Sequence, residues 1–170
     1  MPSGKAIPIE EMKVSAFKIP TDARESDGTL AWDSTTLVLV ETEAGGKKGI
    51  GYSYADTATA TLIKDMLIGV VRGRDAMSIA GNWMALVHAI RNLGRPGIVS
   101  MAIAAVDAAL WDLKAHLLDL PLVKLLGAVR DGVPIYGSGG FTSYSIDELQ
   151  RQLSGWSDAG ISRVKMKIGR

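Results

Sequence analysis

Residues 98–118 form the most apolar segment of the sequence and place the strongest limit on its fold. Apolar side chains recur at helical spacing and leave almost no polar face, so we predict a helix buried between layers. Its most apolar stretch, residues 98–113, is interrupted by Asp107 and Asp112 and is shorter than the ~20 residues that a membrane span needs. The segment therefore predicts a globular protein and no membrane partner.

A small antiparallel sheet is predicted before this helix. Residues 12–20 mix apolar and polar positions, and residues 35–42 are β-branched and apolar, which is typical of strands. Gly45 and Gly46 supply a tight turn before a third strand at 49–54. A glycine pair between two such runs predicts a β-hairpin.

Further helices are predicted around the apolar one. Residues 57–71 carry apolar side chains at helical spacing. Ser78 is placed to cap a second helix that Gly94 closes, and Pro121 fits the first turn of a short helix that ends at Gly127. Strands followed by helices predict an α+β arrangement for this part of the chain.

The last part of the chain has a different pattern of strand, helix and strand. Strands are predicted at 133–136 and 161–168, and Ser145 begins a capping box for the helix between them. A unit of this kind has parallel strands. We predict an α+β domain over residues 1–130 and the start of an α/β domain over 131–170, incomplete because two strands and one helix cannot cover both faces of a sheet.

Composition narrows the possible partners and compartments. The formal net charge is +1, which gives no reason to expect a nucleic-acid partner, because such binding needs clustered cationic side chains. The sequence has 0 cysteines, so disulfides and thiolate metal sites are excluded and a cytoplasmic location is favoured. Residues 1–12 have no apolar core of signal-peptide type.

Two lysines near the C-terminus are the first candidates for chemistry. Strand side chains alternate, so Lys165 and Lys167 share one face while Val164, Met166 and Ile168 share the other. Crowding two ammonium groups lowers the pKa of at least one, and a lysine tuned toward neutrality is a good general base. The simpler interpretation is an amphipathic strand with solvated lysines, and alternation alone favours it.

Other polar groups give weaker signals. Ser138 lies in the glycine-rich segment 137–140, after a predicted strand, where barrel active sites form, although a plain flexible turn fits equally well. Asp112 and His116 are four residues apart on the apolar helix. A third ligand at helical spacing is missing, so an interior hydrogen-bonded ion pair is favoured over a metal site.

Residues 21–33 are polar and are predicted to form a long loop. Arg24, Asp27 and Trp32 lie in it around Gly28. A long polar loop that carries one tryptophan is either a lid that selects substrate or a surface excursion, and the sequence leaves both open.

Four segments together resemble one known family. The run AIAAVDAALWDLKA at 102–115 resembles the helix signature of the mandelate racemase/muconate lactonizing enzymes, which belong to the enolase superfamily. The segment LVKLLG at 122–127 resembles the family's PLYxLLG, with Val123 where tyrosine is common. The segments VPIYGSGGF at 133–141 and KMK at 165–167 resemble the first barrel strand with its loop and the KxK motif of the second strand.

The resemblance implies an α+β capping domain that closes over a modified TIM barrel. It implies removal of the proton α to the carboxylate of a small substrate, with the enediolate stabilised by Mg²⁺. Lys167 would be the base, and Lys165 would lower its pKa and contact the carboxylate. The 21–33 loop, with Arg24 and Trp32, and the segment ending at Tyr52 would be mobile cap loops that select substrate, and Ser138 would lie at the active-site end of the barrel.

The same resemblance also predicts what this chain lacks. The family's metal ligands are three acidic residues at the ends of the third, fourth and fifth barrel strands, and the opposing acid or base lies still later. None of these positions is expected within 170 residues. We therefore expect a truncated barrel with no metal ligand, no activity as a single polypeptide, and exposed apolar faces that favour a homo-oligomer.

Three functions remain open at this point. One is an Mg²⁺-dependent racemase, epimerase or sugar-acid dehydratase, with dehydration favoured. Another is a non-catalytic fragment that serves as an oligomerising or interaction module. The third is a small α+β binding protein, which residues 133–170 would support if they formed an antiparallel hairpin.

Overall fold

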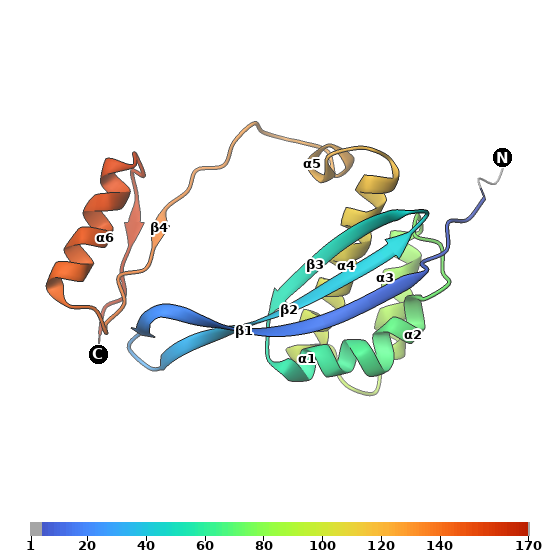
Figure 1. Cartoon of the computed structure of the whole chain (residues 1–170), viewed down its shortest axis with the longest axis horizontal. Helices are drawn as coiled ribbons and strands as arrows, with labels where there is room; N and C mark the ends of the chain where they lie inside the picture. The colour runs from blue at the N-terminus through green and yellow to red at the C-terminus, as the bar shows by residue number, and fades with distance from the viewer. Residues whose placement is uncertain (1–4, 170) are drawn as a thin grey trace. The chain divides into compact units, whose positions relative to one another are not determined.

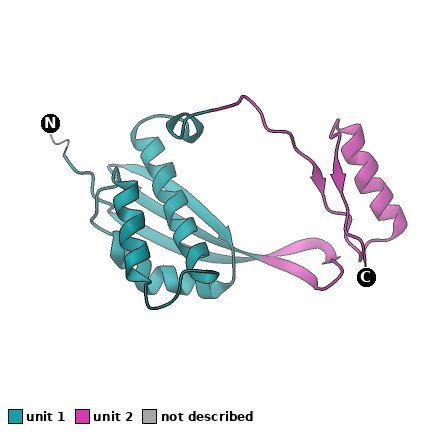
Figure 2. Ribbon diagram, turned by 180° about the vertical axis from the view of Figure 1, so that it is seen from behind, with its two compact units in different colours: residues 1–18, 36–128 teal, residues 19–35, 129–170 magenta. Residues whose placement is uncertain are grey.

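The computed structural model describes residues 5–169, which divide into two compact units (Figure 2). Unit 1 comprises the residues up to Lys18 together with Thr36–Ala128. Unit 2 comprises Ile19–Thr35 together with the residues from Val129 onward. A segment of N-terminal sequence therefore belongs with the C-terminal residues.

Unit 1 is built on a sheet with the strand order β1-β2-β3 (Figure 1). Strands β2 and β3 pair antiparallel, with Leu37 opposite Tyr54 and Ala44 opposite Lys47. Gly45 and Gly46 between them have φ angles of +54° and +72°, which only glycine adopts easily. The predicted hairpin is confirmed. The strand bounds are β1 Glu11–Ser26, β2 Ala31–Ala44 and β3 Lys47–Tyr54.

Helices cover one face of this sheet (Figure 1). The segment predicted as one helix over 57–71 is helical throughout, but it contains a π-helical turn in its middle. Ser78 is the residue before α3, as predicted, although its side chain makes no capping hydrogen bond. The bounds are α1 Thr57–Leu62, η1 Ile63–Leu67, α2 Ile68–Val71, α3 Ile79–Ala89, α4 Ile98–Leu117 and α5 Leu122–Leu125.

Helix α4 lies directly against β3, and glycine makes this possible. A Cβ atom at Gly51 would overlap the carbonyl oxygen of Ala105, and one at Gly49 would overlap backbone atoms of Ala109 and Leu113. The two backbones therefore approach more closely than any side chain on β3 would allow. The predicted buried helix is confirmed for one broad face only, since Met101, Ala104 and Ala108 are exposed along the other. The buried α4 residues are Ala102, Ile103, Ala105, Val106, Ala109, Leu110, Leu113 and Ala115. No helix in residues 5–169 is long and apolar enough to cross a membrane.

Unit 2 contains a strand-helix-strand segment whose two strands are parallel. The strands are shorter than predicted: β4 is Gly137–Ser138 rather than 133–136, and β5 is Val164–Lys165 within the predicted 161–168. Each strand has only the other as a partner, so a continuous ladder exists only where they meet. Helix α6, Ile146–Asp158, begins with the predicted capping box, in which Ser145 and Glu148 bond reciprocally.

The predicted loop over residues 21–33 is wrong. Strand β1 continues to Ser26 and β2 begins at Ala31, so the segment is a hairpin with a short turn. The strand ladder satisfies backbone groups that a polar loop would leave to water. Asp27 and Gly28 lie in the turn, and an Asp-Gly pair is a typical hairpin signal that the polar composition of the segment concealed.

Candidate active site

The candidate site is the face of the β4–β5 sheet opposite α6. A Cβ atom at Gly137 or Gly139 would overlap the Trp156 ring of α6, so these positions face the helix. Ser138 is paired with Lys165 in the parallel register. Alternation along the strand therefore places Ser138 and Lys165 together on the face away from α6.

Lys167 continues the same face two residues later. Its backbone N–H donates to the carbonyl oxygen of Gly140 at 2.8 Å, so the extended pairing runs on past the end of β5. Lys165 is exposed and Lys167 is half-buried. The structure thus brings together three of the predicted site residues, Ser138, Lys165 and Lys167.

The tip of the hairpin carries the carboxylate of Asp27, which the sequence placed in this segment without a predicted role at the site. One oxygen of Asp27 accepts hydrogen bonds from the backbone N–H groups of Thr29 and Leu30 and from the Thr29 hydroxyl, at 2.7–2.9 Å. The bonds from Leu30 and Thr29, aided by the charge of Lys167, lower the pKa of Asp27 to about 2. Asp27 is therefore an anion at neutral pH, within electrostatic range of Lys167.

Arg24 and Trp32 lie on the two strands of the hairpin and line one shallow cavity of about 340 Å³, together with Ala31 and Asp33. The Trp32 indole N–H donates to Glu25 at 2.7 Å, which fixes the ring across the hairpin. The Trp32 ring also meets Phe141 edge-on, with centroids 5.6 Å apart. The structure thus brings these two predicted site residues together on the hairpin.

Comparison with known proteins gives the family of the chain. The N-terminal domain of mandelate racemase/muconate lactonizing enzymes matches residues 18–127. The chain belongs to this family. It is 34% identical over 168 residues to a 3,6-anhydro-α-L-galactonate cycloisomerase of Streptomyces coelicolor, covering 95% of this chain and 46% of the relative.

Solved structures of the family share the fold. A mandelate racemase/muconate lactonizing enzyme-like protein from Rubrobacter xylanophilus is 55% identical, with a TM-score of 0.93 over 96% of this chain and 45% of the other. The L-talarate/galactarate dehydratase of Salmonella typhimurium, solved with Mg and L-lyxarohydroxamate, is 29% identical, with a TM-score of 0.88 over 100% of this chain and 46% of the other. The chain spans less than half the length of the relatives it matches.

Magnesium in that dehydratase raises the question of whether the residues of this family member fit a metal. Within residues 5–169, no group of three or more Asp, Glu, His or Cys side chains converges in a way that could hold a metal ion. Mg²⁺ needs several oxygen ligands in near-octahedral geometry. The described residues therefore do not fit a magnesium site.

Tyr52 lies on β3 in unit 1. It is 59% exposed, and its ring meets that of Tyr54 with centroids 6.2 Å apart. Strand β3 alternates, so both tyrosines lie on the face of the strand opposite the glycines that contact α4. The role of Tyr52 in substrate selection stays a prediction.

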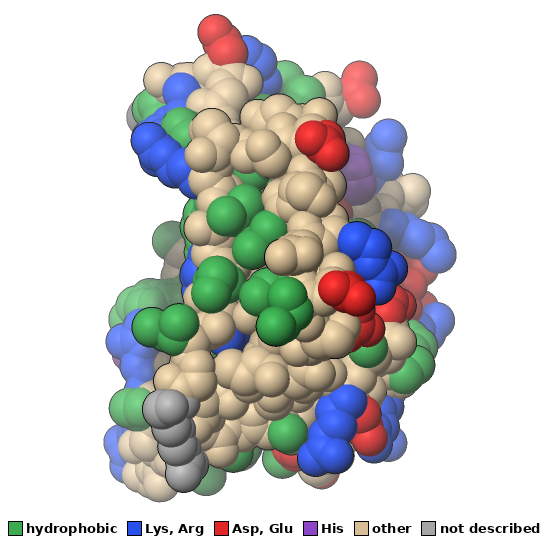
Figure 3. Space-filling view, turned by 90° about the vertical axis from the view of Figure 1, so that its left-hand side faces the viewer, with side chains coloured by type: hydrophobic (Ala, Val, Ile, Leu, Met, Phe, Trp, Pro, Cys, Tyr) green, Lys and Arg blue, Asp and Glu red, His purple; other side chains and the backbone are tan. Residues whose placement is uncertain are grey.

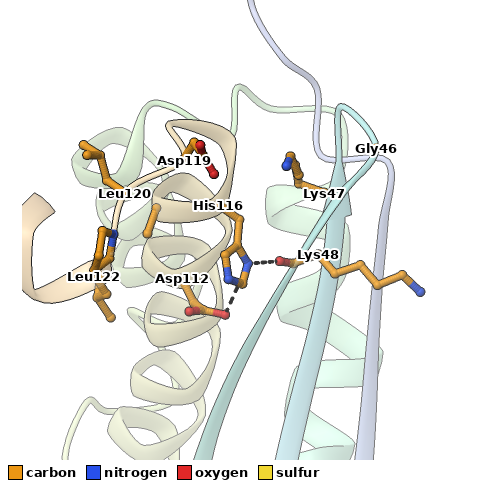
Figure 4. A pocket seen from close by; sticks show the side chains of 10 residues that line it. Gly46, Lys47, Lys48, Asp112, His116, Asp119, Leu120 and Leu122 are labelled. Carbon is orange, nitrogen blue, oxygen red and sulfur yellow. Dashed lines mark hydrogen bonds and ion pairs between the residues drawn. The ribbon is translucent and has the colours of Figure 1, made fainter.

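A cavity of unit 1 with a volume of about 580 Å³ lies beside the end of α4 (Figure 4). Two of its polar side chains form hydrogen bonds to the backbone of the edge strand β3. The Asp112 carboxylate accepts the Ile50 N–H at 2.9 Å, and the His116 ring bonds to the Lys48 carbonyl oxygen. The Asp112 carboxylate and the His116 ring nitrogen are 3.9 Å apart, so the predicted pairing is present, but both side chains are partly exposed and the predicted interior location is wrong. These side chains cover the outer edge of β3, and the cavity does not support a catalytic role.

Proposed function

We propose that this chain forms the cap and the first barrel strands of an enzyme that removes the proton α to the carboxylate of a sugar acid. The observation that carries the proposal is that Ser138, Lys165 and Lys167 lie on one face of the β4–β5 sheet, opposite α6. The Lys167 amine takes the proton from the α carbon, and the Lys165 ammonium pairs with the substrate carboxylate.

The substrate class rests on the relatives. The two named above act on L-talarate or galactarate and on 3,6-anhydro-α-L-galactonate, which are all sugar acids. We propose dehydration as the reaction, with Arg24 and Trp32 of the hairpin contacting the polyhydroxy chain. Polar groups that bond to hydroxyls discriminate strongly between such substrates, because a wrong substrate leaves them unpaired. A cytoplasmic location, inferred from the 0 cysteines, stays a prediction.

Dependence on Mg²⁺ belongs to the same proposal. Residues 5–169 contain no ligand cluster for a metal, so we expect the 170-residue polypeptide alone to bind no Mg²⁺ and to turn over no sugar acid. Calorimetric titration of Mg²⁺ into that polypeptide tests the expectation. Micromolar binding of Mg²⁺ would contradict the expectation.

The function itself is tested on the natural gene product by its intact mass and by exchange of the α proton. A panel of sugar acids that includes galactarate and talarate is incubated with Mg²⁺ in D₂O, and the α-proton signal is followed by NMR. We expect exchange with at least one of them, reduced by about a hundredfold or more in Lys167→Ala, as for loss of a general base. Lys64→Ala, an exposed lysine of unit 1, is the matched control. Undiminished exchange in Lys167→Ala would refute the assignment.

A second candidate is a non-catalytic module that associates with itself. Large apolar side chains of unit 2 are exposed, among them Val129 at 86%, Ile168 at 81% and Ile146 at 73%. Hydrophobic side chains also gather near the middle of the surface in Figure 3. Such surfaces favour association. Light scattering after gel filtration tests this candidate: a dimer without proton exchange supports it, and a monomer at micromolar concentration opposes it.

A further inference from the structure

The hairpin of residues 19–35 is held to the loop after β4 by a set of long-range hydrogen bonds within unit 2. Thr142 supplies most of them. Its backbone N–H donates to the Ser26 carbonyl oxygen at 3.0 Å, and its hydroxyl donates to the Asp27 carbonyl oxygen at 3.1 Å. The Ser26 hydroxyl lies 2.7 Å from the Thr142 hydroxyl. Because Thr142 has one hydroxyl proton and a carbonyl only accepts, Ser26 is the donor in this pair.

The neighbours of Thr142 add to the same contact. The Ser143 hydroxyl donates to the Arg24 carbonyl oxygen at 2.7 Å. Phe141 stands between two other rings, edge-on to Trp32 at 5.6 Å and to Tyr144 at 5.5 Å between centroids. Phe141, Thr142 and Ser143 together are called the clasp below. It reaches both strands of the hairpin and its turn.

Burial of apolar side chains does not hold the hairpin, since none of residues 19–35 is buried. The clasp therefore supplies the described contacts that fix the hairpin within unit 2. The clasp is itself anchored to the lysine strand, because Gly140, the residue before it, accepts the backbone N–H of Lys167 at 2.8 Å. One short loop thus joins the hairpin to the proposed base.

We infer that the clasp is a positioning element that holds the hairpin tip at a set place beside Lys167, with Thr142 as its central residue. The hairpin then acts as a fixed wall that selects substrate, and not as the freely mobile loop expected from the sequence. The part of this inference that concerns substrate rests on the proposed function. The mechanical part rests only on the contacts within unit 2.

Hydrogen–deuterium exchange of the 170-residue polypeptide, read by mass spectrometry, tests the inference. Thr142→Val keeps the shape and the backbone N–H but removes two hydroxyl bonds. We expect amides of residues 19–35 to exchange about tenfold faster, with the amides of α3 and α4 unchanged. Thr142→Ser keeps the hydroxyl and should restore slow exchange. Thr61→Val in α1, whose hydroxyl bonds only within its own helix, is the matched control.

Two outcomes would overturn the inference. If Thr142→Val leaves hairpin exchange unchanged, the clasp does not hold the hairpin. If amide exchange in Thr142→Val rises equally in α6 and the hairpin, Thr142 stabilises unit 2 as a whole and does not specifically position the hairpin. Phe141→Leu, which removes the ring contacts and keeps all the hydrogen bonds, gives an independent check and should also accelerate hairpin exchange. None of these readouts needs catalysis, so failure of the proposed function would leave them interpretable.

Discussion

The two units are stabilised by different means. Unit 1 has a continuous core of fully buried side chains that joins the sheet to the helices, with Val38, Leu67, Leu86 and Leu110 all at 0% exposure. Unit 2 has no buried large apolar side chain among its described residues. Its close contacts are glycines against α6 and hydrogen bonds between the hairpin and the clasp. Unit 1 is thus stabilised by burial of apolar side chains, and unit 2 is held by polar and glycine contacts.

This difference matters for function. Hydrophobic burial contributes most of the free energy of folding, so unit 1 carries the stability of the chain. Segments with few buried apolar contacts open at low free-energy cost, and groups that bind ligands are commonly drawn from them. The proposed lysines and the hairpin both belong to unit 2. Substitutions in the two units should therefore have very different consequences.

The largest effect on stability is expected where the backbones of β3 and α4 touch. Gly51→Ala would push a methyl group into the α4 backbone at Ala105 and Ala109, which cannot move aside as a side chain could. We expect a loss of about 4 kcal/mol in the free energy of unfolding, measured by urea denaturation. Gly69→Ala meets nothing within 4 Å and lies in α2, so it should be neutral or stabilise by about 0.5–1 kcal/mol. Equal effects of the two would contradict the close packing.

Truncation of matched apolar residues compares the units directly. Leu110→Ala in α4 creates a cavity in the core and should cost about 3 kcal/mol. Val164→Ala on β5 removes a side chain that is 46% exposed and should cost about 0.5 kcal/mol or less. Thermal and urea denaturation of both variants measures the two losses in the free energy of unfolding. A cost at Val164 close to that at Leu110 would mean that unit 2 has a core of its own.

A smaller effect is expected from the cap of α6. Ser145→Ala removes the half of the capping box in which the Ser145 hydroxyl oxygen accepts from the Glu148 N–H at 3.3 Å, and keeps the backbone N–H that donates to the Glu148 carboxylate at 2.8 Å. We expect a local loss of about 1 kcal/mol, seen as faster amide exchange in α6 with unit 1 unaffected. Ser157→Ala, in the last turn of the same helix, is the control. Unfolding of unit 1 in Ser145→Ala would show that the units are not independent in stability.

The smallest effect is expected from pH at the hairpin tip. The pKa of Asp27 is about 2 in the folded chain and 3.8 in the unfolded chain. The ionised Asp27 carboxylate therefore contributes fully to hairpin stability above about pH 4. The contribution is lost as the pH falls from 3.8 toward 2. The amide NMR shifts of Thr29 and Leu30 should titrate in that window, and Asp27→Asn should abolish the titration. A midpoint at 3.8 or above would contradict the turn geometry.

Some parts of the fold and site were within reach of local sequence patterns. Residues 98–118 have helical spacing with little polar face, and the structure forms α4 there and buries one broad face of it against β3. The capping box at Ser145 and the glycine turn at Gly45 are local devices, and both are present. The alternation of Lys165 and Lys167 predicts a shared face for both lysines, and their role at the site stays a prediction. Each of these features depends on residues a few positions apart.

Other parts were decided by contacts between distant residues. Residues 21–33 have the composition of a loop, and only pairing between β1 and β2, with Thr142 bonding at a separation of 116 positions, makes them a hairpin. The role of Asp112 and His116 depends on β3 lying beside α4. The bonds between the clasp and the hairpin carry no local signature, although the Asp27-Gly28 pair of the turn does. They form only when chain segments far apart in sequence are brought together.

The amino-acid sequence by itself thus determined the element types, the buried helix, the shared lysine face and the family signature, because these follow from local periodicity and motif spacing. Tertiary structure alone decided that N-terminal residues 19–35 join unit 2, that glycines let β3 touch α4, and that Asp27 lies within electrostatic range of Lys167. The physical reason is that register and close approach depend on the summed packing of segments distant in sequence, which no short pattern encodes.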